Sequence, residues 1–362
     1  MALIALSYFI SVIYYFIIAL ILIIFILQLY LSLPRRFKKI YSGTPDFNTL
    51  VILPCKDIDY SLNENLKSIK GQNYKKYTIV AVVDSEDDPS VEFLRNNRIE
   101  YIISNCESGG SGKVRAIATA LQKYKSYEAY VIVDSDVLAN RDWLEKLLQP
   151  LIDKKYGIST TFPYFEPKNG FWSKFKAAWG FVGVGMMQSE ITVFGWGGSL
   201  AFRKSLMDED DIKKFSEAVS DDMAITDVCK SKGKKVAYAP ESVATIYSPD
   251  DWKVFREWSI RQTSLLLSKT RNAYYIGILL YGSSALLMLG GLLLSLFVSY
   301  YFAVLFLPLL LNEVKMFARL RRKEPIYVIV QILLPFFYVW NLVKGSKNKE
   351  ITWRGNKYNL YD

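Results

Sequence analysis

The chain has 362 residues, a net charge of +10 and a hydrophobic share of 51%, but it contains no histidine. The absence of histidine excludes Ser-His-Asp and Cys-His catalysis and histidine-ligated zinc, so acid–base chemistry falls to carboxylates, lysine or tyrosine. The three cysteines, Cys55, Cys106 and Cys229, are far apart and form no CxxC pair, which predicts reduced thiols in a cytosolic domain. Much of the positive charge lies beside apolar segments, which favours attraction to anionic lipid headgroups and gives no sign of a nucleic-acid partner.

The first element is an apolar run over residues 7–33, which is long enough to span a bilayer. It is too long and too rich in tyrosine and isoleucine for a signal peptide, so we expect a retained transmembrane anchor over residues 1–33. The basic sequence Pro34-Arg35-Arg36-Phe37-Lys38-Lys39 follows. The positive-inside rule places this cluster in the cytoplasm and the N-terminus outside.

The central region alternates strand-like and helix-like segments, which is typical of a sheet built from strand–helix–strand units. The expected strands are 48–54, 77–83, 99–103 and the run ending at Val133, and the expected helices are 60–71, 89–97 and 113–124. The sequence therefore predicts an α/β fold, with a mostly parallel, doubly wound sheet and helices on both faces. We assign residues 45–265 to this cytoplasmic domain.

Several polar residues of this domain follow strands or precede helices, where α/β sheets bind ligands. Asp84 closes the second strand and could accept hydrogen bonds from a nucleotide, although a surface acidic turn fits equally well. The glycine-rich loop ending at Lys113 could face phosphates, but it lacks the P-loop pattern, and a flexible loop is the alternative. Asp134 and Asp136 suit a divalent cation held against a diphosphate, or they form a solvated turn.

Three further segments extend this set towards the membrane. Residues 171–194 are apolar but interrupted by charges, which predicts an interfacial segment lining an acceptor groove, with a buried core helix as the alternative. Asp221 and Asp222 precede the helical segment 223–232, either as part of a favourable helix N-terminus or with one of them as a general base. Arg261 lies on a helical stretch that could rest on the bilayer surface and could also turn this arginine towards a phosphate.

The C-terminal third is expected to hold transmembrane or interfacial helices over residues 273–343. The turn between the first two passes falls at Gly290-Gly291 or near Tyr300-Tyr301, and the last apolar stretch is either a full crossing or an interfacial helix. The region divides into two passes at 273–317, a basic cluster at 319–323, a third apolar stretch at 326–343 and a basic tail at 344–362.

The order of these motifs resembles family 2 glycosyltransferases of the GT-A fold, and the greatest likeness is to ceramide glucosyltransferases. The (Q/R)xxRW box of the family appears as Trp258-Ser259-Ile260-Arg261-Gln262, and this departure argues against processive synthesis. The likeness runs over most of the chain and rests on Asp84, Asp134-Ser135-Asp136, Gly197-Gly198-Ser199, Phe202-Arg203-Lys204, Asp221-Asp222, Arg261 and the tail from Ile351 to Tyr358.

This resemblance implies an inverting, non-processive transfer of a sugar, glucose in the first place, from a UDP-linked or other nucleotide sugar to a membrane lipid alcohol such as ceramide. Asp222 would act as the general base, and Arg261 would add positive charge where negative charge develops. The remaining implied roles are nucleotide-sugar binding by Asp84, Lys113, Asp134, Asp221 and Arg261, and binding of Mn²⁺ or Mg²⁺ by Asp134 and Asp136.

Two other functions fit the same residues. A polyprenyl-phosphate glycosyltransferase would have an acceptor that is already ionised and would need a base less. A membrane-anchored protein that binds nucleotide sugars without turnover, or that supports a transporter, belongs to another class. Transport is disfavoured because the apolar segments 7–33 and 274–311 contain no Asp, Glu, Lys or Arg.

Overall fold

The computed structural model describes residues 2–33, 40–168, 170–353 and 355–360, with the backbone alone at residues 2–11, 13 and 14. The basic cluster at 34–39 and Arg354 of the tail lie outside the described residues. The chain divides into two compact units, which we call the sheet unit (residues 37–251 and 353–359) and the helical unit (residues 1–36, 252–352 and 360–362).

The described part of the sheet unit is built on a seven-stranded sheet with the order β3-β2-β1-β4-β8-β6-β9. The first four strands of this order pair in parallel, β8 is antiparallel to both of its neighbours, and β9 is parallel to β6. The mostly parallel sheet expected from the strand–helix alternation is thus confirmed. Its strands are β1 (Thr49–Pro54), β2 (Tyr77–Val83), β3 (Glu100–Ile103), β4 (Ala129–Val133), β6 (Tyr156–Thr160), β8 (Ser199–Arg203) and β9 (Lys235–Tyr238).

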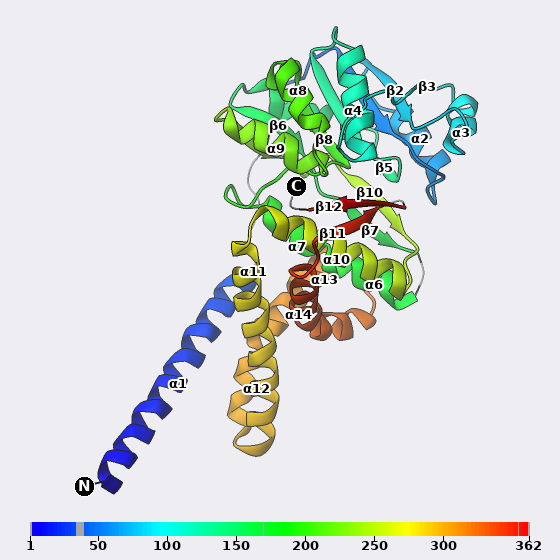
Figure 1. Cartoon of the computed structure of the whole chain (residues 1–362). Coiled ribbons are helices and arrows are strands. Elements are labelled where there is room, and N and C mark those ends of the chain that lie inside the picture. Colours follow the sequence, from blue (N-terminus) through cyan, green and yellow to red (C-terminus); the bar gives the residue numbers. More distant parts are fainter. Residues whose placement is uncertain (1, 34–39, 169, 354, 361–362) are drawn as a thin grey trace. The chain divides into compact units, whose positions relative to one another are not determined.

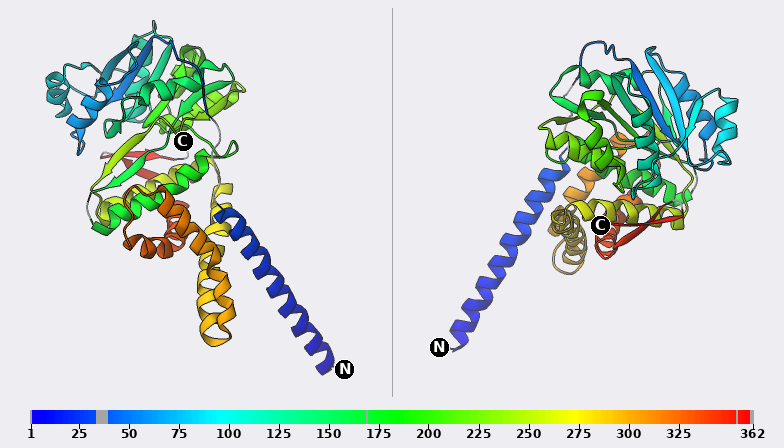
Figure 2. Two further views of the ribbon diagram at one scale, coloured as in Figure 1. Left: turned by 180° about the vertical axis from the view of Figure 1, so that it is seen from behind. Right: turned by 45° about the horizontal axis from the view of Figure 1, so that its top comes forward.

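Both faces of this sheet are buried, as the apolar runs of its central strands require. Ile52 and Ile132 point to one face, in the core that includes Ile117 of α4, while the alternate residues Val51 and Val131 are buried on the other face. Helices α4 and α8 lie side by side (Figures 1 and 2). The helices of the sheet unit are α2 (Leu62–Lys70), α3 (Ser90–Asn96), α4 (Gly112–Lys123), α5 (Trp143–Leu148), α6 (Gly170–Trp179), α7 (Phe181–Met187), α8 (Glu209–Ser216) and α9 (Asp221–Ser231), with 3₁₀ turns at Gln149–Ile152 and Lys204–Leu206.

The remaining described strands form two smaller sheets. In the first, β10 (Ala244–Ser248) pairs antiparallel with β5 (Val137–Ala139) and parallel with β7 (Tyr164–Pro167). The second is formed by β11 (Glu350–Trp353) and β12 (Asn356–Asn359) at the end of the chain. Residues 353–359, which include all of β12, belong to the sheet unit although they follow the apolar helices in sequence.

The helical unit contains the apolar segments. Among the described residues, four helical stretches are long and apolar enough to cross a membrane: Tyr15–Ser32, Asn272–Phe297, Tyr300–Arg319 and Ile326–Gly345. Figure 1 shows α11, the π-helical turn and α12 as one continuous rod. The helices are α1 (Ala2–Ser32), α10 (Trp252–Lys269), α11 (Asn272–Gly277), the π turn (Ile278–Gly282), α12 (Ser283–Phe297), a 3₁₀ segment (Tyr300–Phe306), α13 (Leu307–Arg319) and α14 (Ile326–Gly345).

The break between the first two C-terminal apolar stretches falls after Phe297, next to Tyr300, and the alternative at Gly290-Gly291 lies inside α12. Polar side chains join these helices within the apolar environment. Gln28 of α1 donates to the hydroxyl of Ser283 at 2.7 Å, and Asn312 of α13 donates to the hydroxyl of Ser32 at 2.7 Å. Helix α1 therefore packs against the C-terminal helices through specific hydrogen bonds.

Candidate active site

The carboxyl ends of β1, β2 and β4 lie at one edge of the sheet because these strands are parallel neighbours in register. Lys56 follows β1, Asp84 follows β2 and Asp134 follows β4. The ammonium of Lys56 pairs with the carboxylate of Asp84 at 3.1 Å. Neighbouring strands are about 4.8 Å apart, so Asp84 and Asp134, two strands apart, begin about 10 Å from each other.

Lys113 is the centre of a buried charge cluster in the site. Its ammonium lies 2.6 Å from Oδ1 of Asp134 and 3.1 Å from Oδ2 of Asp221, and the side chains of Lys113 and Asp221 are 11% and 7% exposed. Burial opposes the charge of Lys113, but the two carboxylates outweigh it and raise the pKa of the ammonium. Burial also raises the pKa of Asp134, although Lys113 pulls it down. The first turns of α4 and α9 thus meet at the end of β4.

This close approach requires a glycine in the loop before β8. β8 pairs antiparallel with β4, and the N–H of Asp134 donates to the carbonyl of Gly198 at 3.3 Å. A Cβ on Gly197 would lie 2.2 Å from Oδ2 of Asp221 and 2.9 Å from the Lys113 ammonium. Gly197 therefore leaves the space in which these two side chains pair. In the sequence, Gly197 stands out only as part of the Gly-Gly-Ser motif, which does not predict that it makes room for this ion pair.

α9 begins at Asp221, and Asp222 is its second residue, so both aspartates lie inside the first turn and not before the helix as expected. Oδ1 of Asp222 accepts hydrogen bonds from the hydroxyl of Ser220 and from the N–H of Met223, the latter at 2.8 Å. Ser220 occupies the N-cap position of α9, but its hydroxyl donates to Asp222 and makes no capping hydrogen bond to the backbone. Burial and the charge of Asp221 raise the pKa of Asp222 to about 6, although Ser220 and Lys113 act in the opposite direction.

The turn after β4 offers oxygen ligands for a hard cation. The hydroxyl of Ser135 donates to Asp59, and the side-chain amide of Asn65 donates to the Ser135 carbonyl at 2.9 Å, so this turn is held in place between Asp134 and Asp136. Among the described residues, no cluster of three or more Asp, Glu, Cys or His could hold a metal ion. The two carboxylates of Asp134 and Asp136 nevertheless fit Mg²⁺ or Mn²⁺ shared with substrate phosphates. Such ions are commonly held by one or two carboxylates plus phosphate and water.

The glycine loop before α4 is fixed to the segment after α8. Gly109 donates its N–H to Glu217 at 2.8 Å, and Ser111 donates its N–H to the Ala218 carbonyl at 3.0 Å. A Cβ on Gly110 would lie 2.0 Å from the carbonyl oxygen of Ser216, so this contact requires glycine. The loop is neither a free flexible turn nor a full cradle of phosphate-facing N–H groups. Of the expected phosphate ligands here, the Lys113 side chain is the one inside the carboxylate cluster.

Arg261 lies on α10 in the helical unit. One turn of this helix contacts α14, where the hydroxyl of Ser259 lies 3.4 Å from the side-chain oxygen of Asn341. The carboxylate cluster belongs to the sheet unit, so the role expected of Arg261 towards a phosphate stays a prediction.

The segment 171–194 forms α6, α7 and the loop that leads towards β8. α6 is fixed by a buried ion pair between Lys176 and Asp250 at 2.7 Å, with the ammonium of Lys176 also 5.1 Å from the centre of the Phe165 ring. Three partly buried aromatic rings form a group near this segment. The centre of the Phe162 ring lies 6.3 Å from that of Phe194 and 6.1 Å from that of Trp196. Trp196 directly precedes the glycine that contacts Asp221, so this aromatic group lies next to the charge cluster.

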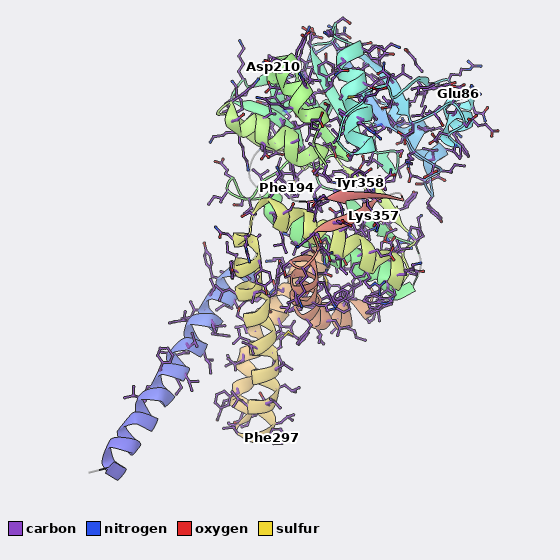
Figure 3. The ribbon with its side chains drawn as sticks, in the orientation of Figure 1. Glu86, Phe194, Asp210, Phe297, Lys357 and Tyr358 are labelled. Atoms are coloured by element: carbon purple, nitrogen blue, oxygen red, sulfur yellow. The ribbon has the colours of Figure 1, made fainter. Side chains whose placement is uncertain are left out.

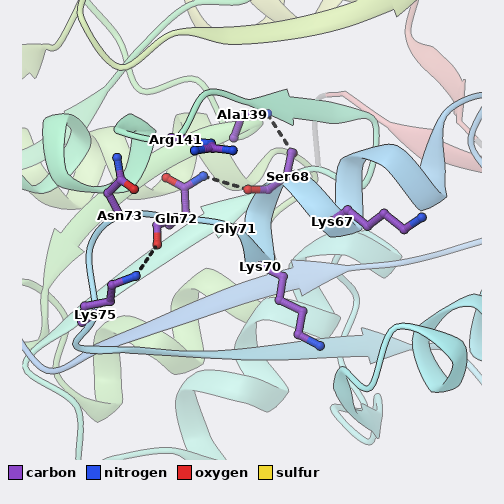
Figure 4. A pocket seen from close by; sticks show the side chains of 9 residues that line it. All are labelled: Lys67, Ser68, Lys70, Gly71, Gln72, Asn73, Lys75, Ala139 and Arg141. Atoms are coloured by element: carbon purple, nitrogen blue, oxygen red, sulfur yellow. Dashed lines mark hydrogen bonds between the residues drawn. The ribbon is translucent and has the colours of Figure 1, made fainter.

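A cavity of about 450 Å³ lies elsewhere in the sheet unit (Figure 4). Its lining includes Lys67, Lys70, Lys75 and Arg141, around the loop that leads from α2 into the amino end of β2. The carboxylates described above follow the carboxyl ends of the strands, so this cavity is not part of the candidate active site. Lysines in the last turn of α2 are also the expected complement of a helix C-terminus.

Comparison with known proteins gives a sequence match over nearly the whole chain. The family model of Glycosyl transferase family 21 matches residues 13–362. Ceramide glucosyltransferase 1 of Caenorhabditis elegans is 23% identical over 230 residues, which are 59% of this chain and 49% of that protein. The chain thus matches about half the length of this curated relative.

Comparison with solved structures gives a mannosyltransferase with a similar fold and, at a lower TM-score, a glucosyl-3-phosphoglycerate synthase. A mannosyltransferase from Pyrobaculum calidifontis, in complex with GDP-Man and Mn²⁺, matches with a TM-score of 0.57 at 17% identity, over 92% of this chain and 97% of that one. A glucosyl-3-phosphoglycerate synthase from Mycobacterium tuberculosis, in complex with Mn²⁺ and UDP-glucose, matches 61% of this chain and 78% of its own at 13% identity, with a TM-score of 0.40.

The family model and the fold together define a glycosyltransferase with a GT-A-type domain. More particularly, the protein belongs to glycosyl transferase family 21, because the family model covers almost all of the chain. The expected likeness to membrane glycosyltransferases of the GT-A fold, with a ceramide glucosyltransferase among the relatives, is confirmed.

Proposed function

We propose that this protein transfers a sugar from a nucleotide sugar to the hydroxyl of a membrane lipid, with inversion at the anomeric carbon and without processive elongation. The observation that carries the proposal is the cluster at the sheet edge, in which Lys113 joins Asp134 and Asp221 beside Asp222. Such a cluster supplies a positive charge for the departing diphosphate and a carboxylate for the acceptor.

The donor would lie across the carboxyl ends of the strands, as ligands do in open α/β sheets. Asp84 would hold the nucleoside at the end of β2, and Asp134 and Asp221 would position the ribose and diphosphate with Lys113. Asp134 and Asp136 would hold Mn²⁺ or Mg²⁺, which when bound neutralises charge on the diphosphate. Arg261 would add a second cationic side chain to the phosphates.

Asp222 would act as the base. Its carboxylate removes the proton of the acceptor hydroxyl as the hydroxyl oxygen forms a bond to the anomeric carbon. The bond from that carbon to the diphosphate breaks on the opposite face, and the electron pair leaves with the nucleoside diphosphate. A carboxylate with a pKa of about 6 is a stronger base than an ordinary aspartate and is still mostly ionised at pH 7. Binding alone does not need a base, so the raised pKa of Asp222 favours a protein that carries out the transfer.

The acceptor class follows from the helices and the aromatic group. Four described stretches are apolar enough to cross a membrane, so the chain can hold the sheet unit at a lipid surface. We assign the sheet unit to the cytoplasmic side, where nucleotide sugars are available. Phe162, Phe194 and Trp196 would contact the apolar part of the acceptor beside the base. The name of the Caenorhabditis elegans relative makes ceramide the first acceptor and a nucleotide-linked glucose the first donor to test.

The test is incubation of purified protein with a total lipid extract, Mn²⁺ and labelled UDP- or GDP-sugars, followed by thin-layer chromatography. We expect a labelled glycolipid that survives mild acid and alkali, and none from the Asp222→Asn variant. A product that mild acid hydrolyses would instead identify a polyprenyl-phosphate acceptor. No labelled lipid with any donor, while the nucleotide still binds, would show a protein that binds without turnover.

A further inference from the structure

The last strand of the chain contacts the loop that opens the candidate donor site. Tyr358 of β12 accepts a hydrogen bond from the N–H of Gly112 at 3.4 Å, across 246 residues of sequence. Figure 3 labels Tyr358 and its neighbour Lys357 on this strand. Both residues belong to the sheet unit, and the family match extends to the end of the chain.

The position of the contact gives it chemical meaning. Gly112 is the first residue of α4, and Lys113 follows it directly and reaches Asp134 and Asp221. In the same turn, the N–H of Val114 is satisfied by the hydroxyl of Ser111. The oxygen of Tyr358 therefore satisfies one of the free N–H groups at this helix start, within one residue of the lysine at the centre of the site.

A tyrosine hydroxyl that accepts one hydrogen bond still has its own proton to donate. When a nucleotide sugar binds, its diphosphate would be an anionic acceptor for this proton, because Lys113 and the start of α4 both favour a diphosphate. The carboxylates of Asp134 and Asp221 would repel the diphosphate of the nucleotide sugar. Hydrogen-bond donors such as the Tyr358 hydroxyl would offset this repulsion. A neutral O–H adds a hydrogen bond without adding to the charge that the buried cluster must balance.

We propose that β12 completes the donor site: Tyr358 accepts the N–H of Gly112 and donates its O–H to a diphosphate oxygen of the nucleotide sugar. This role rests on the proposed function, because it needs a diphosphate beside Lys113. It makes Tyr358 a binding residue for the donor and makes the C-terminal strand a part of the site that donor binding holds in place.

The test uses the purified full-length protein and titrates it with UDP and with GDP in the presence of Mn²⁺. Tyr358→Phe keeps the ring but removes the hydroxyl, and the nucleotide Kd should rise about tenfold because one hydrogen bond to a charged group is lost. The KM for the donor should rise by a similar factor with kcat nearly unchanged. Tyr77→Phe is the matched control, because the Tyr77 hydroxyl donates to the Lys70 carbonyl at 2.6 Å at the opposite end of the sheet.

A second measurement does not depend on turnover. Lys357 is exposed, so trypsin can cleave before Tyr358, and bound UDP or GDP with Mn²⁺ should slow this cleavage at least fivefold in the wild type and much less in Tyr358→Phe. An unchanged Kd in Tyr358→Phe, or a cleavage rate that nucleotide does not alter, overturns the inference alone. A wild-type protein that binds neither nucleotide overturns the proposed function and this role together. A lower melting temperature of Tyr358→Phe, together with a kcat that falls by the same factor as KM rises, would show a structural role. That outcome would also overturn the proposal.

Discussion

Replacing Asp222 by asparagine separates the charge of this side chain from its shape. The side-chain oxygen of asparagine can still accept the hydrogen bonds from Ser220 and from the Met223 N–H, so the start of α9 should keep its geometry. What the variant loses is the ability to take a proton from the acceptor. We expect the transfer rate to fall by about 10²–10⁴-fold, while the affinity for the nucleotide sugar changes little.

The same variant should be more stable than the wild type at neutral pH. The pKa of Asp222 rises from 3.8 to about 6 in the fold, through burial first and the charge of Asp221 second. At 1.36 kcal/mol per pH unit, this shift corresponds to about 3 kcal/mol of unfolding free energy. A raised carboxyl pKa contributes stability that is present below pH 3.8 and lost as the pH rises through about 6. The advantage of the neutral asparagine should therefore be full near pH 7.5 and vanish near pH 4.

The assay combines thermal unfolding between pH 4 and 7.5 with donor titration and single-turnover transfer, all on detergent-purified protein. Asp87→Asn, at an exposed carboxylate after the same strand as Asp84, is the matched control and should change neither stability nor rate. The wild-type rate should also decline as the pH falls through about 6, because the base becomes protonated. Wild-type turnover in Asp222→Asn, or a stability difference that does not depend on pH, would refute the reasoning.

Four other substitutions, at three places, test the packing of the site and of α6. Lys113→Met should lower the unfolding free energy by about 3 kcal/mol and weaken nucleotide binding, because it leaves two carboxylates without their shared cation; unaltered melting and binding would contradict this. Gly197→Ala should cut transfer more than tenfold, since its Cβ would meet the Asp221 carboxylate at 2.2 Å, and full activity would show that the loop can move away. Lys176→Met alone should destabilise by about 3–5 kcal/mol, and Lys176→Met with Asp250→Leu by much less, as measured by denaturant unfolding; equal losses would mean that the ion pair itself is not the cause.

Much of the fold could be predicted from short windows of sequence. The second strand was placed at 77–83, where β2 lies, and the expected helix at 113–124 differs from α4 by one residue at each end. Hydrophobic periodicity and the polar residues that end each run are local properties, so they predict element type and strand direction. Strand direction in turn places Asp84, Asp134 and Asp136 at one edge of the sheet.

The amino-acid sequence by itself thus determined the apolar helices, the parallel core and the strand-end carboxylates. The tertiary structure alone decided that Lys113 joins Asp134 to Asp221, that Gly197 leaves room for this pair, and that β8 runs antiparallel beside β4. The same holds for the contact between Tyr358 and Gly112. The physical reason is that these contacts join residues far apart in the chain, whose distances are set by the packing of whole helices and strands. The raised pKa of Asp222 has the same origin, since burial and a neighbouring charge exist only after the chain has folded.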